Sequence, residues 1–130
     1  IESSKIKSPS MISKNVSIGK NSIINGSVIR NNVRIGINCT IENSVLMEGV
    51  EVADNSIISY SIIGENSNIG NNVIFESSSK ENIMFEIKGK LVDSNRKKLG
   101  SVLGKKVKIG DNVIIPPGQK IESGKIISKN

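Results

Sequence analysis

The chain has 130 residues and a mass of 14.0 kDa, which is enough for one domain but not for two catalytic domains side by side. It has no His and only one Cys, which excludes an imidazole base, a disulfide and a four-ligand zinc site. The net charge of +6 favours anionic ligands, but only Tyr60, Phe75 and Phe85 are aromatic, too few for a platform that stacks nucleic-acid bases.

Isoleucine and valine dominate the apolar residues, with 24 Ile and 11 Val against four Leu and one Ala. Such β-branched residues favour strands and disfavour helices, so we expect an all-β fold. No apolar run is long enough to span a membrane and no signal peptide is visible, which with the lone thiol predicts a cytoplasmic protein and no membrane partner. Because Ile1 begins in mid-pattern, we interpret the chain as a piece of a longer protein.

Residues 1–75 repeat with a period of 17 residues. Three aliphatic series share this period: Ile18, Ile35, Val52 and Ile69; Ile24, Ile41, Ile58 and Phe75; and Ile12, Ile29, Leu46 and Ile63. The series follow one another at spacings of six, five and six residues, which predicts three short strands in each turn of a three-sided coil.

A small or β-branched residue stands two positions before each member of the three series, as Ser22 does before Ile24. In this hexapeptide pattern the large side chain fills the interior and the small one lies under a corner. Asn recurs at 21, 38, 55 and 72, where a corner needs positive φ. The pattern predicts a parallel β-helix with the three aliphatic series stacked inside.

The aliphatic repeat is interrupted over residues 76–99, which we predict to form an extended arm or hairpin inserted at one corner. It returns over 100–130 as a strict spacing of six, in Leu103, Ile109, Ile115, Ile121 and Ile127. We therefore divide the domain into coils (1–75), arm (76–99) and final coils with a cap (100–130). About six coils, at about 4.8 Å each, make a prism about 28 Å long.

The residue before each inward position should point outward, and the three faces then differ. One face is polar and carries Ser17, Arg34 and Glu51. The other two carry apolar stripes, which we predict to contact other subunits or a missing domain; their candidate contact residues are Met11, Ile23, Val28, Val45, Ile57, Ile62 and Ile74. The alternative is that strand propensity alone places Ile and Val on a solvent-exposed face.

Residues 93–108 are the candidate site for an anionic ligand. Six positive charges fall within 13 residues here, next to two glycines that allow close approach of a ligand to the backbone. The candidate binding residues are Arg96, Lys97, Lys98, Gly100 and Gly104. The alternative is a solvated basic edge. Cys39 occupies an inward position without a basic partner, so we assign no catalytic residue and no metal ligand.

The repeat in 24–38 and 58–72 resembles the C-terminal β-helix of sugar-1-phosphate nucleotidylyltransferases, which include ADP-glucose and GDP-mannose pyrophosphorylases. Residues 89–104, followed by 107–110 and Pro117-Gly118, resemble the archaeal-type branch of these enzymes. Some members of that branch also carry a sugar-phosphate acetyltransferase on the β-helix. The resemblance implies a single-stranded left-handed parallel β-helix.

The resemblance also implies a function in oligomerisation, with a trimer as the simplest closed form, and in packing against an N-terminal nucleotidylyltransferase domain. It further suggests binding of a sugar phosphate or a nucleotide sugar. Mg²⁺ would act in the missing catalytic domain, so no cofactor is expected in this fragment. One alternative is an acetyl-CoA-dependent sugar-phosphate acetyltransferase at the subunit interface, but the His that serves as its base is absent. Another is a purely structural hexapeptide scaffold.

The last coil departs from the pattern of the others. Gln119 and Lys125 replace small inward residues, and Lys120 interrupts an apolar stripe. We therefore predict that this coil caps the stack.

Overall fold

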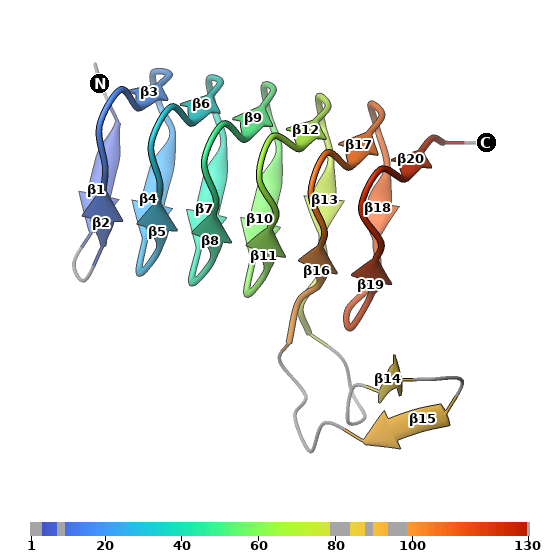
Figure 1. The fold of residues 1–130 in the computed structure, drawn as a ribbon. Coiled ribbons are helices and arrows are strands. Elements are labelled where there is room, and N and C mark those ends of the chain that lie inside the picture. The colour runs from blue at the N-terminus through green and yellow to red at the C-terminus, as the bar shows by residue number, and fades with distance from the viewer. Residues whose placement is uncertain (1–3, 8–9, 79–83, 88–89, 94–98, 130) are drawn as a thin grey trace.

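The protein is a stack of three-sided coils (Figure 1). The computed structural model describes residues 4–7, 10–78, 84–87, 90–93 and 99–129. Across these ranges every regular element is a β-strand, and 18 of the strands form three parallel six-stranded sheets. They wind as a left-handed parallel β-helix of six coils, which confirms the predicted fold class. No helix in the described ranges has the length and apolarity needed to cross a membrane.

Each sheet takes one strand from every coil. Sheet A contains β1 (Lys5–Lys7), β4 (Ile23–Asn25), β7 (Thr40–Glu42), β10 (Ile57–Ser59), β13 (Ile74–Phe75) and β18 (Ile114–Ile115). Sheet B contains β2 (Met11–Ile12), β5 (Val28–Ile29), β8 (Val45–Leu46), β11 (Ile62–Ile63), β16 (Val102–Leu103) and β19 (Lys120–Ile121). Sheet C contains β3 (Ser17–Ile18), β6 (Arg34–Ile35), β9 (Glu51–Val52), β12 (Asn68–Ile69), β17 (Lys108–Ile109) and β20 (Ile126–Ile127).

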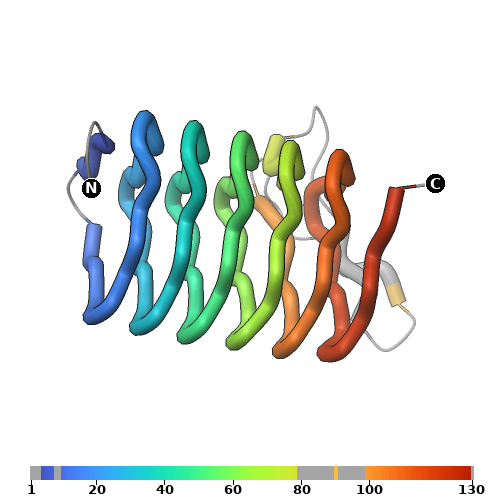
Figure 2. Tube along the Cα trace, turned by 90° about the horizontal axis from the view of Figure 1, so that it is seen from above, coloured from blue at the N-terminus to red at the C-terminus, as the bar shows by residue number. Residues whose placement is uncertain are grey.

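The aliphatic series form the core, as the period predicted. Ile24, Ile41 and Ile58 are fully buried along sheet A, and Ile29, Leu46 and Ile63 are fully buried along sheet B. On sheet C, Ile18, Ile35, Val52 and Ile69 are 2–6% exposed. Successive side chains on a strand point to opposite faces, so each inward residue is flanked by outward ones. The coils follow one another evenly from the N-terminus to the C-terminus (Figure 2).

Buried serines join consecutive coils. The Ser27 hydroxyl accepts a hydrogen bond from the Ser44 N–H at 3.1 Å, and the Ser44 hydroxyl accepts one from the Ser61 N–H at 3.1 Å. The Ser61 hydroxyl in turn accepts from the Ser101 N–H at 3.0 Å. These small residues therefore both fit under the corner and satisfy backbone groups of the next coil. No buried side-chain N or O atom among the described residues lacks a partner.

The corners explain the recurring asparagines. All four recurring asparagines have positive φ, with values between 56° and 63°: Asn21, Asn38, Asn55 and Asn72. Asn tolerates this left-handed conformation better than most residues other than Gly. The corner between sheets A and B is the shortest of the three corners in each coil. The residues that turn it also have positive φ: Gly26, Asn43, Tyr60 and Gly118.

Coil 5 carries the insertion at this A–B corner. Within it, β14 (Met84–Ile87) and β15 (Lys90–Asp93) pair as an antiparallel hairpin between β13 and β16. The Glu76 N–H still donates to the Ile115 carbonyl at 2.9 Å, so Glu76 belongs to the coil. The Leu99 N–H donates to the Ser77 carbonyl at 2.7 Å, which brings the two ends of the insertion together. The chain thus leaves the coil at Ser77 and rejoins it after Leu99.

Candidate functional site

The outward residues of sheets A and B form two apolar stripes. On face A, the outer surface of sheet A, Ile23 is half-buried, Ile57 and Ile74 are exposed, and Ile114 is 57% exposed. On face B, Val28 and Val45 are half-buried, whereas Met11 is 67% and Ile62 45% exposed. All seven predicted contact residues therefore lie on the outside of these two faces.

Strand register aligns the outward residues of consecutive coils into one stripe on each face. On face A, Ile57 pairs with Thr40 on one side and with Ile74 on the other, and Ile74 pairs with Ile114. On face B, the register aligns Met11, Val28, Val45, Ile62 and Val102 in consecutive coils. Apolar side chains that stack about 4.8 Å apart over five coils make a contiguous patch, which usually marks a contact surface. Thr40 is the one polar interruption.

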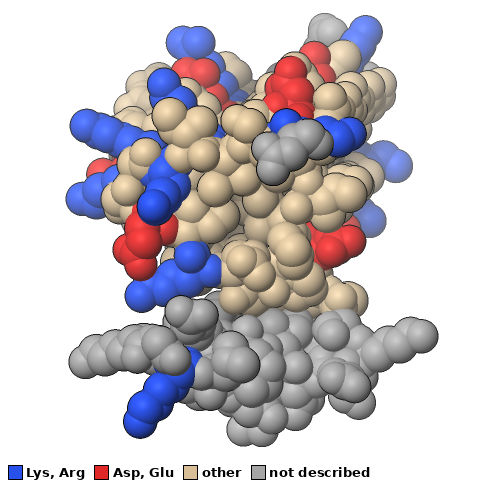
Figure 3. All heavy atoms as spheres, turned by 90° about the vertical axis from the view of Figure 1, so that its right-hand side faces the viewer, with Lys and Arg blue, Asp and Glu red and all other residues tan. Residues whose placement is uncertain are grey.

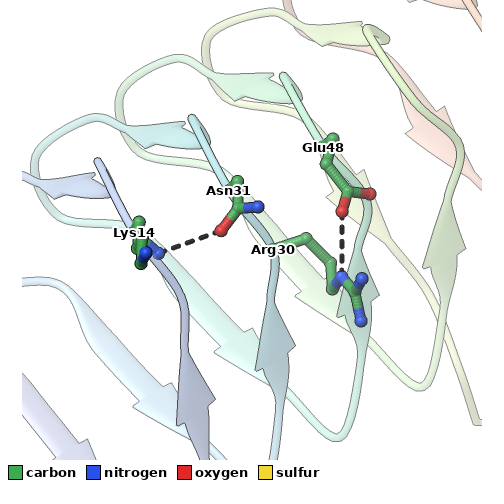
Figure 4. Close-up of polar contacts among 4 residues, drawn as sticks. All are labelled: Lys14, Arg30, Asn31 and Glu48. Atoms are coloured by element: carbon green, nitrogen blue, oxygen red, sulfur yellow. Dashed lines mark hydrogen bonds and ion pairs between the residues drawn. The ribbon is translucent and has the colours of Figure 1, made fainter.

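Face C, the outer surface of sheet C, is polar in the first five coils, whereas in the last coil the apolar Ile126 is exposed on it. Ser17, Arg34, Glu51, Asn68 and Lys108 are all exposed there. At the adjoining B–C corner, Arg30 Nε lies 3.1 Å from Glu48 Oε2, and Asn31 Oδ1 accepts from the Lys14 N–H at 3.1 Å (Figure 4). A bond from its own backbone N–H and the Arg30 side chain lower the pKa of Glu48.

Small residues leave a shallow groove on one side of face C. A shallow groove of about 390 Å³ runs beside Arg34, Glu51 and Asn68, with Gly36 and Ala53 in its wall. Its lining mixes both charge signs and carries no exposed aliphatic residue. Face C thus contrasts with faces A and B, and the apolar surface lies on two of the three sides.

The two apolar faces share the edge from which the insertion leaves. Tyr60 forms this A–B corner in coil 4, and Ser77 occupies the exit in coil 5. The Ser59 and Ser77 hydroxyls lie 3.1 Å apart, and the Ser59 hydroxyl also donates to the Phe75 carbonyl at 3.1 Å. A molecule that covers face A or face B near coil 5 therefore lies next to the insertion.

The predicted anion site is only partly described. Arg96, Lys97 and Lys98 lie outside the described residues. Gly100 is buried, and a Cβ there would meet Ser61 Oγ and the carbonyl oxygens of coil 4. At Gly104 a Cβ would meet the Ser123 nitrogen at 2.6 Å. Close stacking of neighbouring coils therefore accounts for both glycines, and the binding of an anion stays a prediction.

Exposed lysines follow the insertion in coil 5. Lys105, Lys106 and Lys108 are all exposed, and Lys106 turns the B–C corner with φ 56°. No salt bridge involving these three lysines is present in the described part of the chain. Their charges are therefore directed to solvent on the side of the stack next to Gly104.

Cys39 is a core residue. It is fully buried, and its Sγ lies 3.0 Å from the Ala53 carbonyl oxygen. Ser22 and Ser56 occupy the same position one coil away on either side, and their hydroxyls donate to the Gly36 and Gly70 carbonyls at 2.8 and 2.7 Å. No group of three His, Cys, Asp or Glu residues that could hold a metal ion occurs among the described residues.

Burial raises the pKa of the Cys39 thiol from its ordinary value of 9.0, mainly by desolvating the thiolate. The folded chain holds this proton more tightly than the unfolded chain, so the stabilisation is complete below pH 9.0 and is lost as pH rises through the folded pKa. We expect the native thiol to resist alkylation at about pH 8. In urea titrations above about pH 9, the wild type should lose more stability than Cys39→Ser. If the free energy of unfolding falls equally with rising pH in the two proteins, burial does not raise the pKa of the thiol as argued.

Sequence comparison identifies the domain. A family model described as the GMPPB C-terminal domain matches residues 6–130. The chain belongs to the GMPPB C-terminal domain family. It is therefore a C-terminal left-handed β-helix domain of the sugar nucleotidylyltransferase type, as the resemblance of its repeats implied. No curated protein matches the chain in sequence.

Solved structures are similar to this GMPPB C-terminal domain at low sequence identity, and one of them has a TM-score above 0.5. The acetyltransferase domain of PglB from Neisseria gonorrhoeae is 14% identical with a TM-score of 0.54, over 98% of this chain and 52% of that one. A hexapeptide transferase family protein from Anaplasma phagocytophilum is 19% identical with a TM-score of 0.45, over 97% of this chain and 74% of that one. The chain spans about half the length of the PglB domain. At 14% identity, the likeness to the PglB domain concerns the fold alone.

Proposed function

We propose that this GMPPB C-terminal domain holds copies of its parent chain together through faces A and B. The observation that carries the proposal is the pair of apolar stripes, five coils long on each face and interrupted only by Thr40 on face A, beside a largely polar face C. Covering exposed aliphatic side chains removes apolar surface from water, at about 25 cal/mol per Å². Interface centres are typically depleted in charge in this way, whereas rims are polar.

The stripes favour a ring over a simple pair. A two-fold contact that places face A on face A would leave face B uncovered. A contact of face A with face B of the next copy uses both stripes and closes into a ring, of which the parallel trimer is the smallest. The same surface suits packing of the parent chain's N-terminal nucleotidylyltransferase domain, so the test below separates the two occupants.

The test is sedimentation of the 130-residue chain at micromolar concentration. The proposal expects a mass near three times the 14.0 kDa of one chain. Ile57→Lys places a charge in the middle of the face A stripe and should return the mass to that of one chain, because an unpaired ammonium is costly to bury. Asn68→Lys is the matched control on face C of the same coil, and its mass should equal that of the wild type.

A monomeric wild type would contradict assembly by this chain. If the wild-type chain is a monomer but Ile57→Lys makes the longer parent chain less soluble, the face A stripe is covered by the parent's own N-terminal domain. If Asn68→Lys and Ile57→Lys dissociate the oligomer equally, the contact does not distinguish face A from face C.

We also propose that the insertion and the neighbouring lysines bind a sugar phosphate or the phosphates of a nucleotide sugar. The basic residues of 96–108 and the exposed ammonium groups of Lys105, Lys106 and Lys108 support this proposal. In the parent enzyme the domain would serve as an effector site. The joining of a nucleoside triphosphate to a sugar 1-phosphate with Mg²⁺ would take place on the catalytic domain.

Deleting Ser77–Leu99 tests this binding without disturbing the stack. The deletion joins Glu76 to Gly100 and leaves Phe-Glu-Gly-Ser-Val-Leu, which matches Ile-Asn-Gly-Ser-Val-Ile at 24–29. We therefore expect the shortened corner to fold as coil 2 does, with a melting temperature within a few degrees of the wild type. Calorimetry with glucose 1-phosphate should show binding to the full chain and none to the deletion variant.

Three outcomes of the calorimetry separate the alternatives. Binding of glucose 1-phosphate that needs 77–99 supports an effector site. Binding of acetyl-CoA as well would instead favour the acetyltransferase alternative. If neither compound nor a nucleotide sugar binds the full chain, the anion proposal is wrong and the domain is a scaffold.

A further inference from the structure

The groove on face C crosses three consecutive coils and has a volume of about 390 Å³. Its polar side chains are Arg34 on β6, Glu51 on β9 and Asn68 on β12, one from each coil. Strand register places Glu51 directly between the other two. Because neighbouring strands lie about 4.8 Å apart, the three residues follow one another along a line about 10 Å long.

Close stacking of the coils creates this groove. Gly36 and Ala53 form its low wall. A Cβ at Gly36 would meet Asp54 Oδ1 and would lie 3.0 Å from the Ala53 carbonyl carbon in the next coil. The contact between coils therefore restricts this row to small residues, which leaves space beside the outward side chains of Arg34 and Glu51.

The backbone of the groove offers few binding groups. The Gly36 N–H donates to the Val52 carbonyl at 2.8 Å, and the Ala53 N–H donates to the Ile69 carbonyl at 2.8 Å. The Val52 and Ile69 side chains are buried in the core. A ligand in the groove would therefore form its hydrogen bonds with the exposed polar side chains.

These polar side chains are available for a ligand. Arg34 and Glu51 carry opposite charges and are register partners, an arrangement that favours an ion pair. Within the described part of the chain, however, neither side chain makes a salt bridge or a hydrogen bond, and the same holds for Asn68. The Arg30 and Glu48 side chains, from the same two coils, do pair, at 3.1 Å. The groove thus keeps an open donor beside an open acceptor.

The mixture of signs disfavours a ligand with a net charge. Figure 3 shows charged side chains of both signs on the upper side of the stack, where Figure 1 places sheet C. In the groove, an anion near Arg34 would also meet the Glu51 carboxylate, and a cation near Glu51 would meet the Arg34 guanidinium. Opposite charges on neighbouring coils therefore favour a ligand that is neutral overall.

Hydroxyl groups match all three side chains. A guanidinium only donates hydrogen bonds, an ionised carboxylate only accepts them, and an amide does both. A hydroxyl can donate or accept, so a ligand with several hydroxyls can bond to Arg34, Glu51 and Asn68 together. A zwitterion would satisfy the two charged residues but has no matching role for the Asn68 amide.

We propose that the face C groove binds a neutral polyhydroxyl ligand of the size of a mono- or disaccharide, through Arg34, Glu51 and Asn68. Its volume of about 390 Å³ lies within the range of small-molecule sites, about 300–1,000 Å³. The polar side chains are exposed to water, so we expect affinity in the millimolar range. The groove lies apart from the anion site proposed for 96–108 and on the face that the lateral contact leaves uncovered, so the proposal depends on neither of those.

The test is a titration of isotope-labelled protein with maltose, a neutral disaccharide, followed by amide chemical shifts. The amides of Gly36, Ala53 and Glu51 should shift together and saturate in the millimolar range. Glu51→Ala should weaken binding about tenfold, because it removes a charged hydrogen-bond acceptor. Glu51→Gln should keep most of the affinity, because its amide oxygen still accepts from a hydroxyl.

Glu48→Ala is the matched control. It removes the same charge from coil 3, but at the B–C corner outside the groove, and should bind maltose as the wild type does. Both glutamates lie outside the core, so the circular dichroism of each variant should match that of the wild type. If Glu48→Ala weakens binding as much as Glu51→Ala, the binding does not take place in the groove and the proposal is wrong.

Parallel titrations with free glycine and with inorganic phosphate test the class of ligand. If maltose leaves the three amides unchanged, or binds Glu51→Ala as tightly as the wild type, the proposal is overturned. Tighter binding of glycine than of maltose at the same amides would assign the groove to zwitterions, and tighter binding of phosphate would assign it to anions. Either result would refute a neutral ligand, whatever the oligomeric state of the domain.

Discussion

Replacing Phe75 by Ala should lower the free energy of unfolding by about 3–5 kcal/mol. Among the residues whose burial the structure describes, Phe75 has the largest fully buried side chain, 1% exposed, and its strand pairs with that of Ile115 in the next coil. Coils on both sides are held by backbone hydrogen bonds, so the cavity left by the ring cannot collapse without breaking the ladder. Urea unfolding followed by circular dichroism measures the loss.

Ile126→Ala is the control for the Phe75 substitution. Ile126 is also apolar but lies on face C and is 70% exposed. Its truncation removes little buried surface and should cost less than about 0.5 kcal/mol. Comparable losses for the two variants would contradict the assignment of Phe75 to the interior.

Gly64→Ala should destabilise the protein by about 1–3 kcal/mol, because there is no room for a methyl group. A Cβ at Gly64 would meet the carbonyl group of Gly104 and would lie 2.8 Å from the Leu103 carbonyl oxygen. Both neighbours are backbone of the next coil, so relief requires the coils to move apart. Thermal or urea unfolding gives the change in stability.

Gly110→Ala is the matched control and should have the opposite sign. A Cβ at Gly110 would lie 3.4 Å from the Ile127 carbonyl oxygen, an ordinary contact, and Gly110 does not have positive φ. Alanine there restricts the unfolded chain and should stabilise the protein by up to about 1 kcal/mol. Destabilisation of similar size at both glycines would mean that coil spacing does not explain the glycines.

The coil architecture could be predicted because one physical constraint repeats in every turn. Ile24, Ile41 and Ile58 recur at 17 residues since each fills the same place in the interior, and the asparagines recur since each corner needs positive φ. The outward stripes followed from the same alternation. The left hand came from family resemblance, because apolar spacing is the same for either hand.

Features that depend on contacts between coils were less visible in the sequence. Residue 76 was placed in the arm, yet Glu76 still bonds to coil 6, which only the register reveals. Gly100 and Gly104 suggested close approach of a ligand, and the structure shows close approach of neighbouring coils. The basic ligands of the predicted anion site, Arg96, Lys97 and Lys98, lie outside the described residues. Periodicity indicates the direction of a side chain but not the molecule that covers it.

The most direct test of the account measures whether face A is covered in solution. In a Cys39→Ser background, single cysteines are placed at Ile57 and at Asn68, which are both exposed in one chain. Alkylation rates are then compared at micromolar protein concentration. The account predicts that Cys at 57 reacts at least about tenfold more slowly than Cys at 68, and that dilution removes the difference. Equal rates at all concentrations would contradict the assignment of the apolar faces as the contact surface.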